Sequence, residues 1–249
     1  MPPITTDAII LHTIRYGETS KIVRLLTPDL GVQSAMAKGA LKPKSKFGGR
    51  LQVLSEGTIQ LYVKPQRELH TLSEFDVTTE HHALAGDLKR YTAATALAEL
   101  ALRVTPAEPV PEVFVIAQTA LAALGTAPVD KVDETGLRAL WAVIAALGFA
   151  PSLDVCARDS RSLPEGDVTF SVVEGGFVCS RCAAGAGGAR LGSADRRTLI
   201  AFVEGHDEPV GGLSPKHAAA HRRLLARFVE RHVAEGANLK ALALWQETT

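Results

Sequence analysis

Residues 38–51 read KGALKPKSKFGGRL, and this stretch decides how the N-terminal part of the chain is interpreted. It holds five cations and no acid, namely Lys38, Lys42, Lys44, Lys46 and Arg50. Pro43 fixes one backbone angle and lacks an N–H donor, while Gly48 and Gly49 permit the positive backbone angles of a tight turn. The sequence therefore predicts a shaped loop rather than a helix, and we call residues 38–51 the basic loop.

One aromatic residue, Phe47, stands among these cations. In proteins that hold single strands, a base stacks on such a ring while neighbouring cations follow the phosphates. The alternative is that Phe47 is buried in the core and that the lysines only solubilise the loop.

Cations also exceed acids around the basic loop, although the formal net charge of the whole chain is zero. Residues 15–50 contain eight Lys and Arg against two acids, and we include Arg15 and Arg24 in the predicted surface. Counterion release depends on the phosphates neutralised locally, so a basic stripe on a neutral protein indicates a polyanion site.

Strand-like patterns flank the basic loop on both sides. Five stretches are β-branched, apolar or alternating: residues 8–14, 21–26, 32–37, 58–63 and 68–72. Residues 27–31, TPDLG, predict a turn that returns the third stretch antiparallel to the second. Short strands without room for crossover helices favour a small antiparallel barrel of the oligonucleotide-binding (OB) type, although an SH3-like barrel fits this pattern equally well.

The apolar period becomes helical from about residue 80. A first helix over residues 84–103 is predicted to bury Leu84, Leu88, Tyr91, Ala94, Leu97, Ala98 and Ala101. Further helices are expected over residues 113–124, 137–147 and 194–203, and from Ser214 onward. We therefore expect an α+β protein, with a barrel over residues 1–80 and a helical domain over 81–249.

The last helix aligns three arginines four residues apart, Arg223, Arg227 and Arg231. This stripe is either a solvated face or an extension of the polyanion surface. His217 and His221 lie on the same helix, and we assign both to the surface.

A cysteine knuckle interrupts the helices at about residues 152–192. Cys156, Cys179 and Cys182 supply three soft ligands at a spacing typical of structural zinc sites. Asp159 stands where a first C-x-x-C pair would be completed, and a carboxylate can also bind zinc. Two interpretations stay open: one structural Zn²⁺ held by Cys₃Asp, or a metal-free knuckle held by packing around Val172, Phe177 and Val178.

No motif of covalent catalysis is present, so we expect no enzyme and no catalytic residue. A zinc deaminase needs H-x-E before P-C-x-x-C, but the H-x-E at residues 206–208 follows Cys182, and Val178 precedes Cys179. The glycine-rich residues 185–192 lack the Lys-Ser/Thr of a phosphate loop and are expected to be a linker. With no signal peptide, no membrane-length apolar run and few cysteines, a cytoplasmic protein is expected.

The stretches KGALKPKSKFGG, AIILHTIRYGETSKIVRLLTPDLG and LWAVIAALGFAPSLDVC together closely resemble the RecO family of bacterial DNA repair proteins. The resemblance covers nearly the whole chain and implies an OB-fold followed by a helical domain. Family members with a zinc knuckle carry cysteine at the position of Asp159, so this chain departs from their pattern.

The resemblance also implies a function and partners. A RecO protein binds single- and double-stranded DNA without sequence specificity and anneals complementary strands at the nucleoid. With RecR it helps to load RecA onto DNA coated by single-stranded-DNA-binding protein (SSB), whose C-terminal tail is a further partner. The alternative is a non-enzymatic adaptor whose basic loop binds an acidic protein tail.

Overall fold

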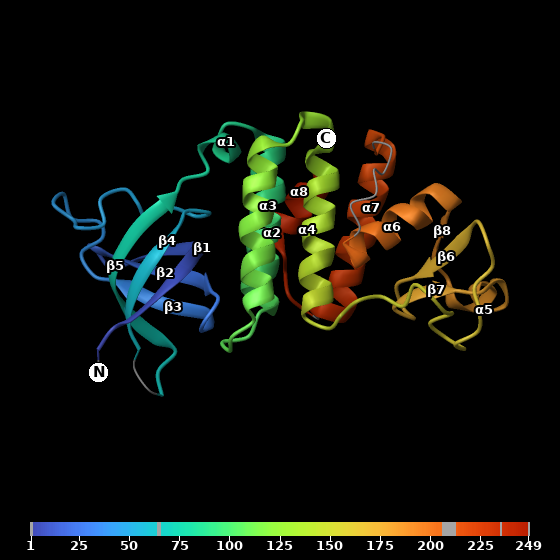
Figure 1. The fold of residues 1–249 in the computed structure, drawn as a ribbon, viewed down its shortest axis with the longest axis horizontal. Helices are drawn as coiled ribbons and strands as arrows, with labels where there is room; N and C mark the ends of the chain where they lie inside the picture. Colours follow the sequence, from blue (N-terminus) through green and yellow to red (C-terminus); the bar gives the residue numbers. More distant parts are fainter. Residues whose placement is uncertain (1, 64–65, 206–212, 235, 249) are drawn as a thin grey trace. The chain divides into compact units, whose positions relative to one another are not determined.

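The computed structural model describes residues 2–63, 66–205, 213–234 and 236–248 (Figure 1). The chain divides into two compact units, Met1–Thr126 and Ala127–Thr249. The H-x-E at residues 206–208 lies outside the described residues. No helix of the described part has both the length and the apolar character to cross a membrane.

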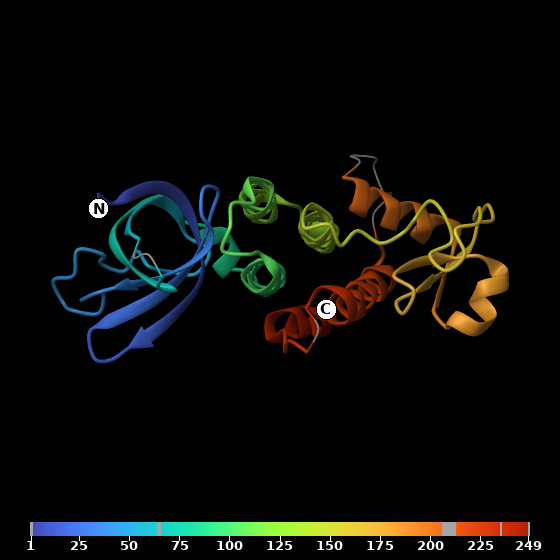
Figure 2. The same ribbon diagram turned by 90° about the horizontal axis from the view of Figure 1, so that it is seen from below.

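The first unit begins with five strands that close into a barrel (Figures 1 and 2). They are β1 (Ile4–Tyr16), β2 (Ser20–Thr27), β3 (Gly31–Ala37), β4 (Glu56–Tyr62) and β5 (Leu69–Thr79). Strand β1 pairs antiparallel with both β2 and β4, and a parallel β3–β5 pair closes the order β1-β2-β3-β5-β4. This connectivity confirms the predicted OB-type barrel, because an SH3-like meander has no such parallel pair.

The barrel core follows from alternation along the strands. Val23 and Leu25 of β2, and Ile59 and Leu61 of β4, point inward and are fully buried. Gly31 begins β3 with a positive φ of 67°, and a Cβ there would collide with the carbonyl of Glu108. Only glycine fits at this turn, because the connection between the next two long helices lies directly against it.

Three helices complete the first unit: α1 (His82–Ala85), α2 (Leu88–Val104) and α3 (Pro111–Thr126). The helix predicted over 84–103 is broken before Leu88, because the Asp87 carboxylate caps α2 by accepting a 2.9 Å hydrogen bond from the Arg90 amide. Leu88 and Tyr91 were predicted to be buried, but they are 69% and 41% exposed. At about 100° per residue, Leu88 lies roughly opposite Leu97, which faces the core.

The second unit holds the remaining helices and a small sheet. The helical segments are η1 (Val129–Lys131), α4 (Val132–Ala146), α5 (Ser180–Ala186), α6 (Ser193–Glu204), α7 (Pro215–Phe228), the π-helical η2 (Val229–Val233) and α8 (Lys240–Glu247). The sheet has the order β7-β6-β8, from β6 (Val168–Ser171), β7 (Gly176–Val178) and β8 (Ala189–Leu191). The linker prediction for residues 185–192 was wrong, because Ala189–Leu191 pairs with β6.

The barrel ends at Thr79, close to the division expected at residue 80. By packing, however, α2 and α3 belong to the same compact unit as the barrel. Strand β1 explains this grouping, because it contacts α2 extensively. Ile9 and Leu11 of β1 point away from the barrel core, yet both side chains are buried.

Candidate nucleic-acid interface and metal site

The basic loop is a series of tight turns that follows β3. Hydrogen bonds of 3.0–3.1 Å close successive turns, from the amides of Lys42, Ser45, Gly48 and Arg50 to the carbonyls of Gly39, Lys42, Ser45 and Phe47. Gly48 has a positive φ of 52°, as predicted, whereas Gly49 does not have a positive φ. Gly39, which was not singled out, also has a positive φ of 71°. The loop therefore has a defined shape without being a helix or strand.

Phe47 holds this loop against the barrel. Its side chain is 2% exposed and packs in the barrel core together with Ala40 and Leu51. The predicted stacking of a base on Phe47 is thus corrected, because its ring faces the core. Lys46 Nζ lies 5.4 Å from the centroid of the ring, so the ring also touches one cation of the loop.

The five cations of the basic loop all point into solvent. Within the described ranges, none of them forms an ion pair with an acid. The Arg50 guanidinium donates hydrogen bonds to the carbonyl of Phe47 at 3.1 Å and to that of Lys46. Arg50 therefore supports the shape of the loop, while the four lysines are free to meet a polyanion.

The end of the β1–β2 hairpin adjoins the basic loop. The Leu41 amide donates to the carbonyl of Thr19 at 2.8 Å, and Lys21 Nζ donates to the carbonyl of Leu51 at 3.1 Å. Arg15 is exposed and lies opposite Lys21 in the strand register. These contacts add Arg15 to the positive surface of the loop.

Arg24 lies farther along β2, opposite His12 and Ser34, and is half-buried. Its Nε atom is buried and has no hydrogen-bond partner among the described residues. The sequence analysis did not single out two residues of the β1–β2 hairpin that lie beside the basic loop. Lys21 donates to the loop at Leu51, and Tyr16 pairs with Ser20, which contacts the loop at Gly39. The hairpin signal at residues 16–20 pointed to this region.

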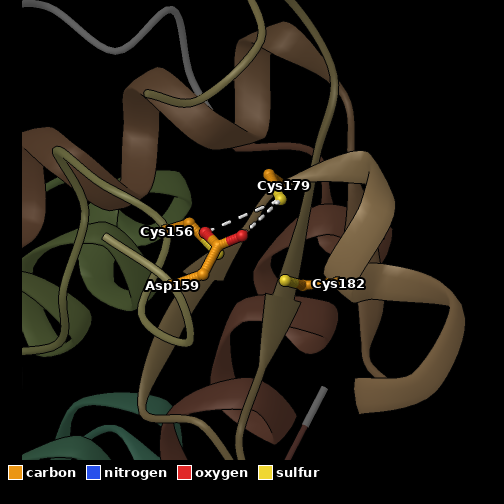
Figure 3. Close-up of side chains that lie close together, drawn as sticks. All are labelled: Cys156, Asp159, Cys179 and Cys182. Atoms are coloured by element: carbon orange, nitrogen blue, oxygen red, sulfur yellow. Dashed lines mark hydrogen bonds between the residues drawn. The ribbon is translucent and has the colours of Figure 1, made fainter. Parts of the chain in front are cut away.

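The cysteine knuckle brings together the four side chains that its spacing predicts. The sulfur atoms of Cys156, Cys179 and Cys182 and a carboxylate oxygen of Asp159 all lie within 4.8 Å of one another (Figure 3). The oxygens of Asp159 lie 3.8 and 3.9 Å from Cys179 Sγ. Cys179 is the residue before α5, so Cys182 follows in the first turn of that helix.

The same cluster shifts the pKa values of its members. A hydrogen bond from the Cys156 side chain is the main cause that lowers the pKa of Asp159 to about 2. The backbone N–H of Cys182 lowers the pKa of the Cys179 thiol, whereas desolvation raises the pKa of Cys182 to about 12. In the metal-free protein, Asp159 is therefore the group most readily ionised.

The donor set fits a zinc ion. Zinc takes four ligands in a tetrahedron, with sulfur at about 2.3 Å and carboxylate oxygen at about 2.0–2.2 Å. Four ligand atoms within 4.8 Å of one another satisfy this requirement with small side-chain movements. A bound ion would join the loop at Cys156 to the start of α5, which is a structural role.

The arginine stripe of α7 and η2 is exposed at Arg223, Arg227 and Arg231. Arg223 and Arg227 also line a cavity of about 390 Å³ in the second unit. The surface assignment holds for His217 but was wrong for His221, which is 2% exposed. Position 221 shares the inner face of α7 with Leu224 and Leu225, three and four residues on.

Taken together, these features define a class: proteins with an OB-type barrel bearing a cation-rich loop, followed by helices that carry a cysteine knuckle. Comparison with known families gives the particular one. Residues 1–80 match the model described as Recombination protein O N terminal, and residues 85–242 match Recombination protein O C terminal. The chain belongs to the RecO family of DNA repair proteins.

Individual relatives agree with this assignment. The DNA repair protein RecO of Anaeromyxobacter dehalogenans (strain 2CP-C) is 32% identical over 241 residues, which cover 94% of this chain and 92% of that protein. The DNA repair protein RecO of Salinibacter ruber (strain DSM 13855 / M31) is 35% identical over 179 residues, or 70% and 66% of the two chains.

Proposed function

We propose that the chain is a recombination mediator that binds single- and double-stranded DNA without sequence specificity, through the basic loop and the adjoining end of the β1–β2 hairpin. It anneals complementary strands and, with RecR, helps to load RecA onto DNA coated by SSB, whose C-terminal tail it contacts. It works in the cytoplasm at the nucleoid and catalyses no covalent step. Membership of a family of DNA repair proteins supports this assignment.

The observation that carries the proposal is the geometry of the basic loop. Phe47 and Leu51 anchor it in the barrel core, so its lysines stay outside on a backbone of defined shape. Lysine ammonium groups meet phosphates as point charges and read no sequence. A grip of this kind is readily displaced as salt or competing strands change, which suits a protein that must pass DNA on.

The test exchanges Lys42, Lys44 and Lys46 together for Glu. We expect weaker binding of a short single strand and a plot of log K against log salt that is flatter by about 0.7 for each lost phosphate contact. These lysines are exposed, so the free energy of unfolding should change little.

A charge-matched control exchanges Arg103, Arg197 and Lys240 for Glu, since all three are exposed and lie outside the basic loop. An unchanged salt slope in the loop variant would contradict a DNA role for the loop. Adding an acidic tail peptide in excess to the protein–DNA complex tests the adaptor alternative. If the basic loop is a site for an acidic protein tail, the peptide should displace the DNA completely; DNA binding that persists would contradict the adaptor alternative.

For the knuckle, the proposal is that Cys156, Cys179, Cys182 and Asp159 hold one structural zinc ion. The convergence of their four ligand atoms supports it.

A further inference from the structure

The barrel carries a row of mostly apolar side chains on its outside, and the β1–β2 end of this row adjoins the basic loop. Directly paired residues on neighbouring strands point to the same face of a sheet. The register sets Ile14 opposite Ile22, Ile22 opposite Met36, Met36 opposite Thr71, and Thr71 opposite Tyr62. Tyr16 lies two residues beyond Ile14 and therefore faces the same way. We call these six residues the outer band.

Several members of the outer band are unusually open to solvent for apolar side chains. Ile14 is 46% exposed, Tyr16 is 52% exposed and Tyr62 is 45% exposed. Ile14 and Tyr62 lie on the outward row, since their partners Ile22 and Thr71 alternate with the buried Val23 and Leu72. Contiguous exposed apolar patches with a polar border are typical of binding surfaces.

Tyr16 is the aromatic residue of the outer band that is linked to the basic loop by hydrogen bonds through its strand partner. It pairs with Ser20 at the end of the hairpin, and the Gly39 amide donates to Ser20 Oγ at 3.4 Å. The next residue on the turn side, Thr19, accepts from Leu41 of the loop at 2.8 Å. Across the part of the chain that the structure describes, the Tyr16 hydroxyl has no hydrogen-bond partner.

Cations border the middle of the band as well. A surface hollow of about 660 Å³ is lined by Met36 and Thr71 of the band together with the cations Lys38 and Arg67 and one acid, Glu68. The outer band therefore presents aromatic and aliphatic side chains, with cations nearby at its middle and at its Tyr16 end. Unpaired bases have matching π-faces and a phosphate backbone to meet those cations, whereas the stacked bases of a duplex cannot reach a ring.

We propose that the outer band holds the bases of single-stranded DNA and that Tyr16 stacks on one of them, so that Tyr16 sets the preference of the barrel for unpaired over paired strands. The inference rests on the proposed function and assigns to Tyr16 the stacking role that the burial of Phe47 leaves open. The lysines of the basic loop serve both kinds of DNA, because both present phosphates.

The test compares Tyr16→Ala with Tyr16→Phe, which keeps the ring. A matched control is Tyr91→Ala, because Tyr91 is 41% exposed on α2, outside the barrel. Each variant is titrated with a single strand, an abasic strand of equal phosphate number, and a duplex. For Tyr16→Ala we expect the Kd of the single strand to rise about 5- to 100-fold, which is the range for losing one base stack.

The other readouts of Tyr16→Ala should stay at their wild-type values: the Kd of the abasic strand, the Kd of the duplex, and the salt slope. Tyr16→Phe and Tyr91→Ala should bind all three ligands normally. In the unmodified protein, light-induced crosslinking of a single strand containing 5-iodouracil should label Tyr16, which does not depend on the folding of any variant.

Equal loss on the single strand and the abasic strand would overturn the proposal, since stacking would then not be the cause. Unchanged single-strand binding in Tyr16→Ala would overturn it too and leave the band as a contact for a protein. In both cases the lysine exchanges would still weaken binding, so the proposed function would stand. Failure of the unmodified protein to bind DNA would overturn the proposed function itself.

Discussion

Single residues of the basic loop differ in whether they anchor the loop or extend into solvent. Phe47 anchors, because its ring fills the barrel core, whereas Lys46 beside it is exposed. We expect Phe47→Ala to lower the free energy of unfolding by about 3–5 kcal/mol, since it leaves a cavity in the core. Lys46→Ala should stay within about 0.5 kcal/mol. Urea denaturation of both variants measures this, and a Phe47→Ala protein of unchanged stability would mean that the ring is not in the core.

Cys179 gives a second prediction at the residue scale. If zinc is bound, elemental analysis after gentle purification should find one ion per chain, and Cys179→Ser should lower both the zinc content and the melting temperature. DNA affinity per folded molecule should hardly change, because the site joins two segments of the second unit. A large loss of affinity at equal folded fraction would instead make the knuckle part of the DNA surface.

At the scale of elements, the packing of α7 on its neighbours buries an ionisable group. His221 Nε2 lies 3.2 Å from a carboxylate oxygen of Asp195 in α6, and its ring packs at 5.8 Å from that of Phe202. Desolvation lowers the pKa of His221 below 6.5; Asp195 opposes this shift and His217 adds to it. The unfolded chain therefore binds the proton more tightly than the folded one, and stability falls as the pH drops through 6.5.

We expect His221→Gln to remove part of this dependence between about pH 7.5 and pH 5.5, because Gln does not titrate. Urea midpoints at several pH values measure the difference between wild type and variant, so that other titrations cancel. His82→Gln serves as the control, since its side chain is 82% exposed and it belongs to α1 of the first unit. Parallel curves for wild type and His221→Gln would refute the assignment.

At the scale of the whole molecule, cations are exposed on both compact units. The basic loop belongs to the first unit, and Arg223, Arg227 and Arg231 belong to the second. Annealing must bring two polyanions together, and screening their repulsion requires more positive surface than one strand occupies. On the proposed function, we therefore expect the two basic surfaces to bind one strand each.

The triple exchange of Arg223, Arg227 and Arg231 for Ala tests this idea. We expect nearly normal binding of one short oligonucleotide, slower annealing of complementary strands and weaker binding of longer DNA. The fold should tolerate the change, because Ala is the best helix former and the three positions are exposed. Annealing at the wild-type rate in low salt, where electrostatic effects are largest, would reduce the stripe to a solvated face.

The sequence by itself determined the features that depend on local periodicity and spacing. Alternation, β-branched content and turn signals located all five barrel strands, although β5 continues to Thr79, seven residues beyond its predicted end. Residues 27–31 set the β2–β3 turn. The spacing of Cys156, Cys179 and Cys182 likewise predicted a cluster, and Asp159 was correctly placed in it.

Only the tertiary structure decided the features that depend on partners distant in the chain. Phe47 stands among charges with no apolar period, and its burial follows from the barrel interior that closes around it. Strand β8 is three residues long and forms because it can pair with the edge of β6. The parallel β3–β5 pair, which distinguishes OB from SH3-like barrels, joins segments about 35 residues apart. The exposure of Tyr16 belongs here too, because local pattern tells which face a side chain takes, and only packing tells whether that face is covered.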